Sequence, residues 1–153
     1  MTATVAGPVR AGLGGGLRAG PLGRAPLWCH NSLMETVVVV DDDSGFRALV
    51  GELLRLSGFA VIGHAGDGHH AVAVARRLRP DIVLLDIQLP GADGFWVARQ
   101  LLADAVPPLV VLMSGRSPED YGDSLQGCRG VAGFLAKADL TGTMLRQLVL
   151  TPP

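Results

Sequence analysis

The sequence lacks the features that would place the protein in several large classes. No apolar run approaches the roughly 20 residues that a membrane-spanning helix needs; the longest, such as Val37 to Val40, suit a short buried strand. The net charge is −1, which offers no electrostatic argument for binding nucleic acid or an acidic membrane. The two cysteines, Cys29 and Cys128, are too few for a disulfide framework, and isolated thiols fit a reducing cytosol. We therefore expect a cytoplasmic protein that binds neither nucleic acid nor membrane directly.

The first 33 residues differ in composition from the rest of the chain. They are rich in Gly, Ala, Pro and Arg, include the run Gly14-Gly15-Gly16, and show neither a helical nor a strand period. We expect a disordered arm there, a folded domain over residues 34–150 and a short tail over 151–153. Met34 stands just before the first predicted strand, so an upstream start codon is one explanation for the arm.

From residue 35 onward, strand and helix patterns alternate. Short β-branched or apolar runs predict strands, and apolar residues at helical spacing predict the helices between them. The predicted strands are 36–40, 59–65, 81–86, 109–113 and 131–135, and a helix follows each, the fourth a short one over 118–126. Strands separated by helices form right-handed βαβ units and a parallel sheet covered on both faces. The expected fold is therefore α/β, with a doubly wound five-stranded parallel sheet.

Polar residues capable of chemistry stand at the carboxyl ends of four predicted strands, where open parallel sheets bind their ligands. They are Asp41, Asp42 and Asp43 after the first strand, Asp86 at the end of the third, Ser114 after the fourth and Lys137 after the fifth. Each alone is more often a helix cap or a surface residue. Parallel topology gathers them on one edge, and clustered carboxylates need a cation, for which Mg²⁺ is the natural choice. No glycine-rich phosphate-binding motif of either common type is present.

Four segments resemble the motifs of response-regulator receiver domains. They are Val40–Arg47, Pro80–Gly94, Val110–Gly115 and Gly133–Lys137, in the order and at the spacing usual in that family. The resemblance implies a flavodoxin-like fold with strand order 2-1-3-4-5. It also implies a signalling phosphoacceptor of two-component systems, which catalyses only its own phosphorylation and slow dephosphorylation and is otherwise not an enzyme.

The resemblance also implies roles for individual residues. Asp86 would be the phosphoacceptor, whose carboxylate attacks the phosphorus of a phosphohistidine on a sensor histidine kinase. Lys137 and Ser114 would bind phosphoryl oxygens and offset their charge. Mg²⁺ would be held by Asp41, Asp42, Asp86 and the backbone carbonyl of Gln88.

A switch is implied at Ser114 and Phe134. Movement of Ser114 toward the phosphoryl group would let the Phe134 ring fill the vacated space and reshape the face of helix 4, strand 5 and helix 5. Ala138 stands where the family usually has a proline after the lysine, so we expect a trans bond and a looser loop. No helix-turn-helix pattern precedes Pro153; we expect the output to come from another protein or from a homodimer.

Two other function classes stay open. A pseudo-receiver would bind partners constitutively without taking phosphate, although degenerate receivers typically lose one of the acidic, hydroxyl or lysine residues retained here. A Mg²⁺-dependent phosphohydrolase using Asp86 would need a second acid two residues later, but residue 88 is Gln. We interpret Asp43 as a neighbouring charge or a helix cap. We interpret His69 and His70 as surface residues, because adjacent helical side chains point in different directions.

Overall fold

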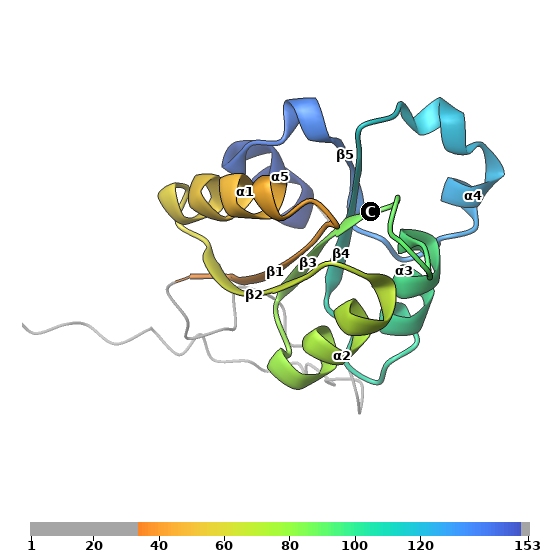
Figure 1. Cartoon of the computed structure of the whole chain (residues 1–153), viewed down its shortest axis with the longest axis horizontal. Coiled ribbons are helices and arrows are strands. Elements are labelled where there is room, and N and C mark those ends of the chain that lie inside the picture. The colour runs from red at the N-terminus through yellow and green to blue at the C-terminus, as the bar shows by residue number, and fades with distance from the viewer. Residues whose placement is uncertain (1–33, 151–153) are drawn as a thin grey trace, which may run out of the picture.

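The computed structural model describes residues 34–150; the predicted arm (1–33) and tail (151–153) lie outside them. Five parallel strands form one sheet in the order β2-β1-β3-β4-β5 (Figure 1). The strands are β1 Thr36–Val40, β2 Ala60–Ala65, β3 Ile82–Asp86, β4 Leu109–Ser114 and β5 Gly133–Ala136. The predicted fold class and strand order are therefore confirmed.

Helices cover both faces of the sheet. They are α1 Ser44–Leu56, α2 Gly68–Leu78, α3 Gly94–Leu102, α4 Asp123–Gln126 and α5 Gly142–Leu150, with short 3₁₀ turns η2 Pro118–Tyr121 and η3 Lys137–Asp139. Helices α1 and α5 lie on one face, and α2 and α3 on the other (Figure 1). Within the described residues, no helix is long and apolar enough to cross a membrane.

Aspartates begin three of these helices. The side chains of Asp43, Asp67 and Asp93 each accept a hydrogen bond from the backbone N–H three residues later, at 2.8–3.0 Å. This is the N-cap arrangement that satisfies a free donor in the first turn. Of the two interpretations of Asp43, the structure shows the helix cap; Asp93 caps α3 in the same way.

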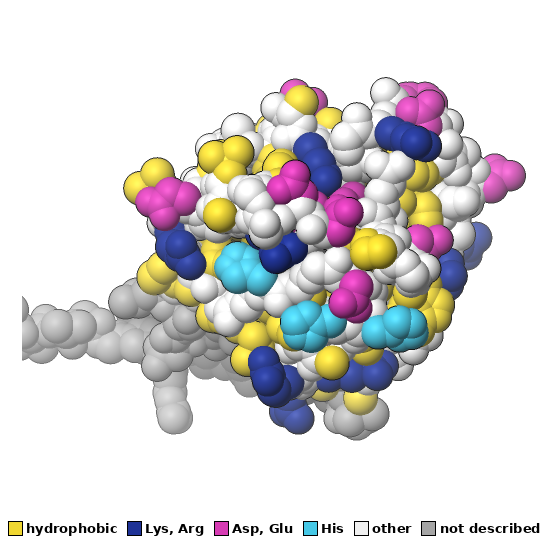
Figure 2. Space-filling model, in the orientation of Figure 1, with side chains coloured by type: hydrophobic (Ala, Val, Ile, Leu, Met, Phe, Trp, Pro, Cys, Tyr) yellow, Lys and Arg dark blue, Asp and Glu magenta, His cyan; other side chains and the backbone are white. Residues whose placement is uncertain are grey.

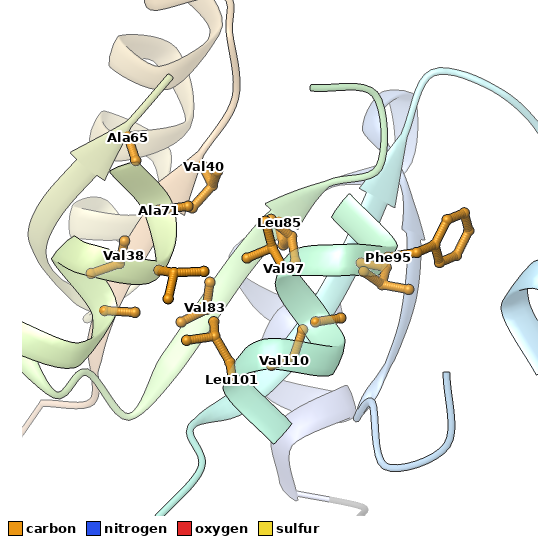
Figure 3. Close-up of a cluster of buried hydrophobic side chains, with 14 of the residues drawn as sticks. Val38, Val40, Ala65, Ala71, Val83, Leu85, Phe95, Val97, Leu101 and Val110 are labelled. Atoms are coloured by element: carbon orange, nitrogen blue, oxygen red, sulfur yellow. The ribbon is translucent and has the colours of Figure 1, made fainter. Parts of the chain in front are cut away.

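The core forms two layers, one on each face of the sheet. Val38 and Val40 of β1 pack toward α2 and α3, whereas Val37 and Val39 pack toward α1 and α5. Because strand side chains alternate between faces, a strand buried on both sides needs a continuous apolar run. Figure 3 shows the first layer, where Val38 and Val83 lie beneath the helices that carry Ala71 and Val97.

The strand register brings the polar residues to one edge. Val40 lies opposite Leu85, Asp86 opposite Met113 and Ser114 opposite Ala136. The residues that follow β1, β3, β4 and β5 consequently emerge side by side at the carboxyl edge of the sheet.

Two predicted elements differ from the structure. The single helix predicted over 118–126 is instead a 3₁₀ turn and one turn of α-helix, separated by Gly122 with φ +48°. Neither piece has a buried residue, so no apolar face defines a longer helix there. The fifth strand pairs from Gly133 rather than from Val131, because its ladder with β4 starts opposite Val111.

Candidate functional site

Three aspartates lie together at the carboxyl edge of the sheet. Asp41 and Asp42 follow β1 and Asp86 ends β3, and one carboxylate oxygen of each lies within 4.8 Å of the others. Asp41 and Asp86 are only 0 % and 2 % exposed, whereas Asp42 is exposed. The structure thus brings together the three carboxylates expected to bind Mg²⁺.

The ammonium of Lys137 lies among these carboxylates. Its Nζ is 2.6 Å from Asp41 Oδ2 and 3.1 Å from Asp86 Oδ2. It also lies 4.6 Å from the centroid of the Phe46 ring, within reach of a cation–π interaction. Lys137 follows β5 and Phe46 belongs to the first turn of α1, so two carboxylates and an aromatic ring from separate elements position one cation.

The cluster carries more negative than positive charge, because three carboxylates face one ammonium. Asp41 Oδ1 accepts a hydrogen bond from the Asp43 N–H at 2.9 Å. The other oxygen, Asp41 Oδ2, is buried and has no hydrogen-bond partner among the described residues, and the Lys137 ammonium is its charged neighbour. Buried carboxylate charge needs compensation, and carboxylate oxygens are the ligands that Mg²⁺ prefers. The residues present therefore fit a Mg²⁺ ion.

Burial governs the ionisation of Asp86. It raises the pKa of the Asp86 carboxyl above its ordinary value, against the opposing effects of the Gln88 N–H and Lys137, and the charge of Asp41 adds to the rise. Burial lowers the pKa of Lys137, but the Asp41 and Asp86 carboxylates beside its ammonium outweigh this and leave that pKa raised. Lys137 is therefore a permanent cation at neutral pH. Asp86 shares this one cation with Asp41, so the negative charge of the ionised pair is only partly compensated.

The backbone around Asp86 is held closely. The Gln88 N–H donates to Asp86 Oδ1 at 3.0 Å; the expected role of the Gln88 carbonyl stays a prediction. A Cβ at Gly94, the first residue of α3, would lie 2.3 Å from the Asp86 carbonyl oxygen, so only glycine allows this approach. At Gly115, on the other side of the site, a Cβ would have no neighbour within 4 Å.

Ser114 is buried at the end of β4 and already has two hydrogen-bond partners. Its Oγ accepts from the Arg116 N–H at 3.0 Å and shares a hydrogen bond with the hydroxyl of Tyr121. The Tyr121 ring contacts Phe134 of β5 at 6.5 Å and Phe95 of α3 at 5.7 Å between centroids. The expected switch pair, Ser114 and Phe134, is therefore bridged by a residue that sequence reasoning missed.

Sequence reasoning missed two other contacts of the site. Phe46 covers the Lys137 ammonium, and the Arg47 guanidinium donates to the backbone carbonyl of Asp41. Phe46 and Arg47 lie in the first turn of α1, directly after the three aspartates. Only the direction in which this helix leaves β1 shows what their side chains contact. For Tyr121, the one available signal is that it is the only tyrosine of the chain.

The remaining predictions about single residues fit the structure. His69 and His70 are exposed, and the His69 ring lies against Trp96, with centroids 4.8 Å apart. The bond before Ala138 is trans, since no cis peptide occurs among residues 34–150.

On the face shown in Figure 2, acidic, basic and histidine side chains are interspersed rather than gathered by sign.

Residues 37–148 match the family model described as "Response regulator receiver domain". The chain belongs to this family. Receiver domains are parts of two-component signalling proteins, and the family binds Mg²⁺ at an acidic pocket. The described residues of this chain include one acidic cluster of three carboxylates, Asp41, Asp42 and Asp86.

Known proteins similar to this receiver domain include regulators and isolated receivers. Over 84 residues it is 44 % identical to the DNA-binding response regulator MtrA of Mycobacterium tuberculosis, a match that covers 54 % of this chain and 36 % of MtrA. The receiver domain of the response regulator NarL from the same organism superimposes with a TM-score of 0.67 at 38 % identity, over 78 % of this chain and 95 % of that one.

A third relative is a CheX–CheY–BeF₃–Mg²⁺ complex from Borrelia burgdorferi. It superimposes with a TM-score of 0.62 at 26 % identity, and the match covers 76 % of this chain and 87 % of that one. The chain spans about a third of the length of the curated relative MtrA (36 %), so the similarity concerns the receiver part of that protein.

Proposed function

We propose that this receiver domain takes a phosphoryl group from a sensor histidine kinase onto Asp86 in a Mg²⁺-dependent reaction. The observation that carries the proposal is the buried pair Asp41 and Asp86, linked by Lys137 and left with uncompensated negative charge. A purely structural ion pair would be expected to balance its charges. Here the imbalance suits a site that binds a divalent cation and a phosphoryl group together.

The transfer needs little covalent assistance from the protein. A carboxylate oxygen of Asp86 attacks phosphorus, a P–O bond forms, and the P–N bond to the kinase imidazole breaks with its electron pair returning to nitrogen; the other ring nitrogen carries a proton, so the ring leaves as neutral imidazole. The products are an acyl phosphate on Asp86 and a neutral histidine on the kinase. Because Asp86 reacts as the anion, positioning and charge neutralisation supply the catalysis.

The residues around Asp86 fit that task. The Gln88 N–H orients one carboxylate oxygen of Asp86, and the Lys137 ammonium lies 3.1 Å from the other. From there it can stabilise the negative charge of the phosphoryl oxygens during transfer. A Mg²⁺ ion held by Asp41, Asp42, Asp86 and the Gln88 carbonyl would offset the remaining negative charge. The related CheY complex, whose name includes BeF₃ and Mg²⁺, supports the proposal, since beryllofluoride imitates a phosphoryl group on a carboxylate.

The output is proposed to be a protein contact. Phosphorylation would act through Ser114 and Phe134 on the face formed by α4, β5 and α5, which would then bind an output protein or a second copy of the chain. We place this activity in the cytoplasm. In this proposal the domain is a regulator that catalyses only its own phosphorylation and slow dephosphorylation.

Intact-protein mass spectrometry after incubation with acetyl phosphate and Mg²⁺ tests the phosphoacceptor. We expect one added HPO₃, stable in acid and lost in base, which is absent in Asp86→Asn and abolished by EDTA. Asp104→Asn is the matched control, since Asp104 pairs with Arg76 far from the site and this variant should retain the adduct. Unmodified wild-type protein under every divalent cation tried would favour a pseudo-receiver; continuous release of phosphate would favour a hydrolase.

A further inference from the structure

The hydroxyl of Ser114 already has two hydrogen-bond partners. It accepts from the Arg116 N–H and shares a second hydrogen bond with the Tyr121 hydroxyl, in which either oxygen can be the donor. A serine hydroxyl can donate only one hydrogen bond. When Ser114 donates to Tyr121, it must give up that bond before it can donate to a phosphoryl oxygen on Asp86.

Tyr121 is well placed to retain Ser114. Its ring packs edge-on against Phe95 and lies close to Phe134, so the hydroxyl is presented by a ring held on two sides. Phe134 itself has no hydroxyl and cannot bind Ser114 in this way. The aromatic ring and the hydroxyl of the switch are therefore supplied by two different residues, Phe134 and Tyr121.

The segment that carries Tyr121 is weakly anchored. Between residues 115 and 127 every residue is exposed except Tyr121 and Leu125, which are half-buried against the core. A segment with so few buried contacts is easily displaced. Loss of the bond between Ser114 and Tyr121 would remove one of its few attachments to the sheet.

We propose that Tyr121 is a positioning residue that holds Ser114 in the unphosphorylated arrangement and releases it when Asp86 is phosphorylated. The inference rests on the proposed phosphorylation of Asp86 and names the group that its charge displaces. Release frees the Tyr121 hydroxyl and loosens residues 115–127, so phosphorylation is transmitted directly to the exposed segment beside β5. Phe134 then responds to the departure of Tyr121 as well as to that of Ser114.

The first test measures the affinity of the metal-loaded full chain for beryllofluoride in Tyr121→Phe. This variant keeps the ring and its contacts with Phe95 and Phe134 but removes the hydroxyl. Binding should become about two- to tenfold tighter, the range that one net hydrogen bond is worth, because Ser114 no longer has to be released. In the Ser114→Ala background the same substitution should have no effect on affinity.

The second test uses Tyr121 as a reporter, since it is the only tyrosine of the chain. Uniform labelling with 3-fluorotyrosine gives one ¹⁹F resonance from a single site. Beryllofluoride with Mg²⁺ should move that resonance in the same direction as Ser114→Ala does, because both remove the same hydrogen-bond partner. A packing role alone would not link these two shifts.

The outcomes separate the two proposals. If the wild-type chain binds beryllofluoride no better than Asp86→Asn, the proposed function is wrong and this inference fails with it. If the wild type binds but Tyr121→Phe has the same affinity, or gains equally in the Ser114→Ala background, the inference alone is overturned. A ¹⁹F resonance that stays in place when beryllofluoride binds overturns it as well.

Discussion

Aspartates are buried at both the amino end and the carboxyl end of the parallel strands, but their carboxylates have different partners at the two ends. At the amino end, Asp81 precedes β3 and its Oδ2 accepts hydrogen bonds from the Thr36 N–H at 2.9 Å and the Thr36 hydroxyl at 3.0 Å. The Asp81 N–H also donates to the Thr36 Oγ1 at 2.9 Å. At the carboxyl end, Asp41 and Asp86 share the single ammonium of Lys137.

The difference separates a carboxylate that accepts several hydrogen bonds from two carboxylates that share one cation. Asp81 joins the starts of two neighbouring strands through its hydrogen bonds with Thr36. Asp41 Oδ2 is buried without a good hydrogen bond, and burial opposes the charge on Asp86. Burial of this negative charge destabilises the folded protein, and a cation that binds the carboxylates would stabilise it. We therefore expect a cation to bind at the carboxyl end of the sheet rather than at Asp81.

Removal of the shared cation should produce the largest effect. We expect Lys137→Met, which keeps an unbranched side chain beneath Phe46, to lower the free energy of unfolding in metal-free buffer by about 3 kcal/mol, because two buried carboxylates lose their partner. Mg²⁺ should restore part of this loss. Urea denaturation with and without Mg²⁺ measures both effects.

The control is Arg76→Met, which breaks the ion pair with Asp104 at the surface and should change stability far less, because exposed ion pairs contribute little. A Lys137→Met effect as small as that of the control would show that the carboxyl end is fully solvated, and the contrast between the two ends would disappear.

Asp81→Ala should come next, at about 2 kcal/mol, because the Thr36 N–H and hydroxyl lose their acceptor. In contrast with Lys137→Met, added Mg²⁺ should not reduce the loss, and the affinity for Mg²⁺, measured by isothermal titration calorimetry, should be unchanged. A Mg²⁺ affinity that falls with Asp81→Ala would mean that the two ends are coupled through the sheet.

Asp86→Asn should stabilise the metal-free protein at neutral pH, and the gain should depend on pH. Since the pKa of Asp86 is raised in the folded protein, the folded state binds its proton more tightly than the unfolded chain does. Wild-type stability contributed by this group therefore falls as pH rises from the ordinary pKa of an aspartate, 3.8, through the raised one. The difference between variant and wild type should widen over that window and be constant above it.

Thermal unfolding in EDTA from acidic to neutral pH follows this difference, and Asp104→Asn serves as the pH control. A difference that stays the same at every pH would contradict the argument, because the effect would then come from packing or hydrogen bonds rather than from ionisation.

The smallest effect is expected from Phe46→Leu. Leucine keeps an apolar side chain but loses the ring face above Lys137 Nζ, a contact worth about 0.5–1 kcal/mol. The rate of phosphorylation by acetyl phosphate should fall roughly two- to fivefold, while Mg²⁺ affinity stays near that of the wild type. Phe46→Tyr, which retains the ring, should restore the rate; no rescue would assign Phe46 to packing alone.

The sequence was sufficient for the parts of the site that follow from topology. Asp41, Asp86, Ser114 and Lys137 stand at strand ends, and parallel strands necessarily bring such ends to one edge. Asp43 and Asp93 precede helical patterns, where an aspartate side chain satisfies a free N–H. These features depend on local chemistry and on one rule of sheet geometry.

The contacts that depend on the path of an exposed segment could not be predicted. Tyr121 returns to Ser114 because of the course of residues 115–120, which no apolar period describes, and Gly122 interrupts the predicted helix with a positive φ. The contact between Phe46 and Lys137 depends on how α1 leaves β1. In both cases the partner lies on another element, and spacing along the chain contains no information about it.

Two glycines at the carboxyl edge of the sheet define where this site can be redesigned. A side chain at position 94 would collide with the carbonyl of Asp86, so any library that varies it displaces the proposed phosphoacceptor. A Cβ at position 115 would have no neighbour within 4 Å; under the proposed function, substitutions there would screen an acyl phosphate from water without moving Asp86. A biosensor or timer built on this domain should therefore adjust its signal duration at Gly115 and keep Gly94 unchanged.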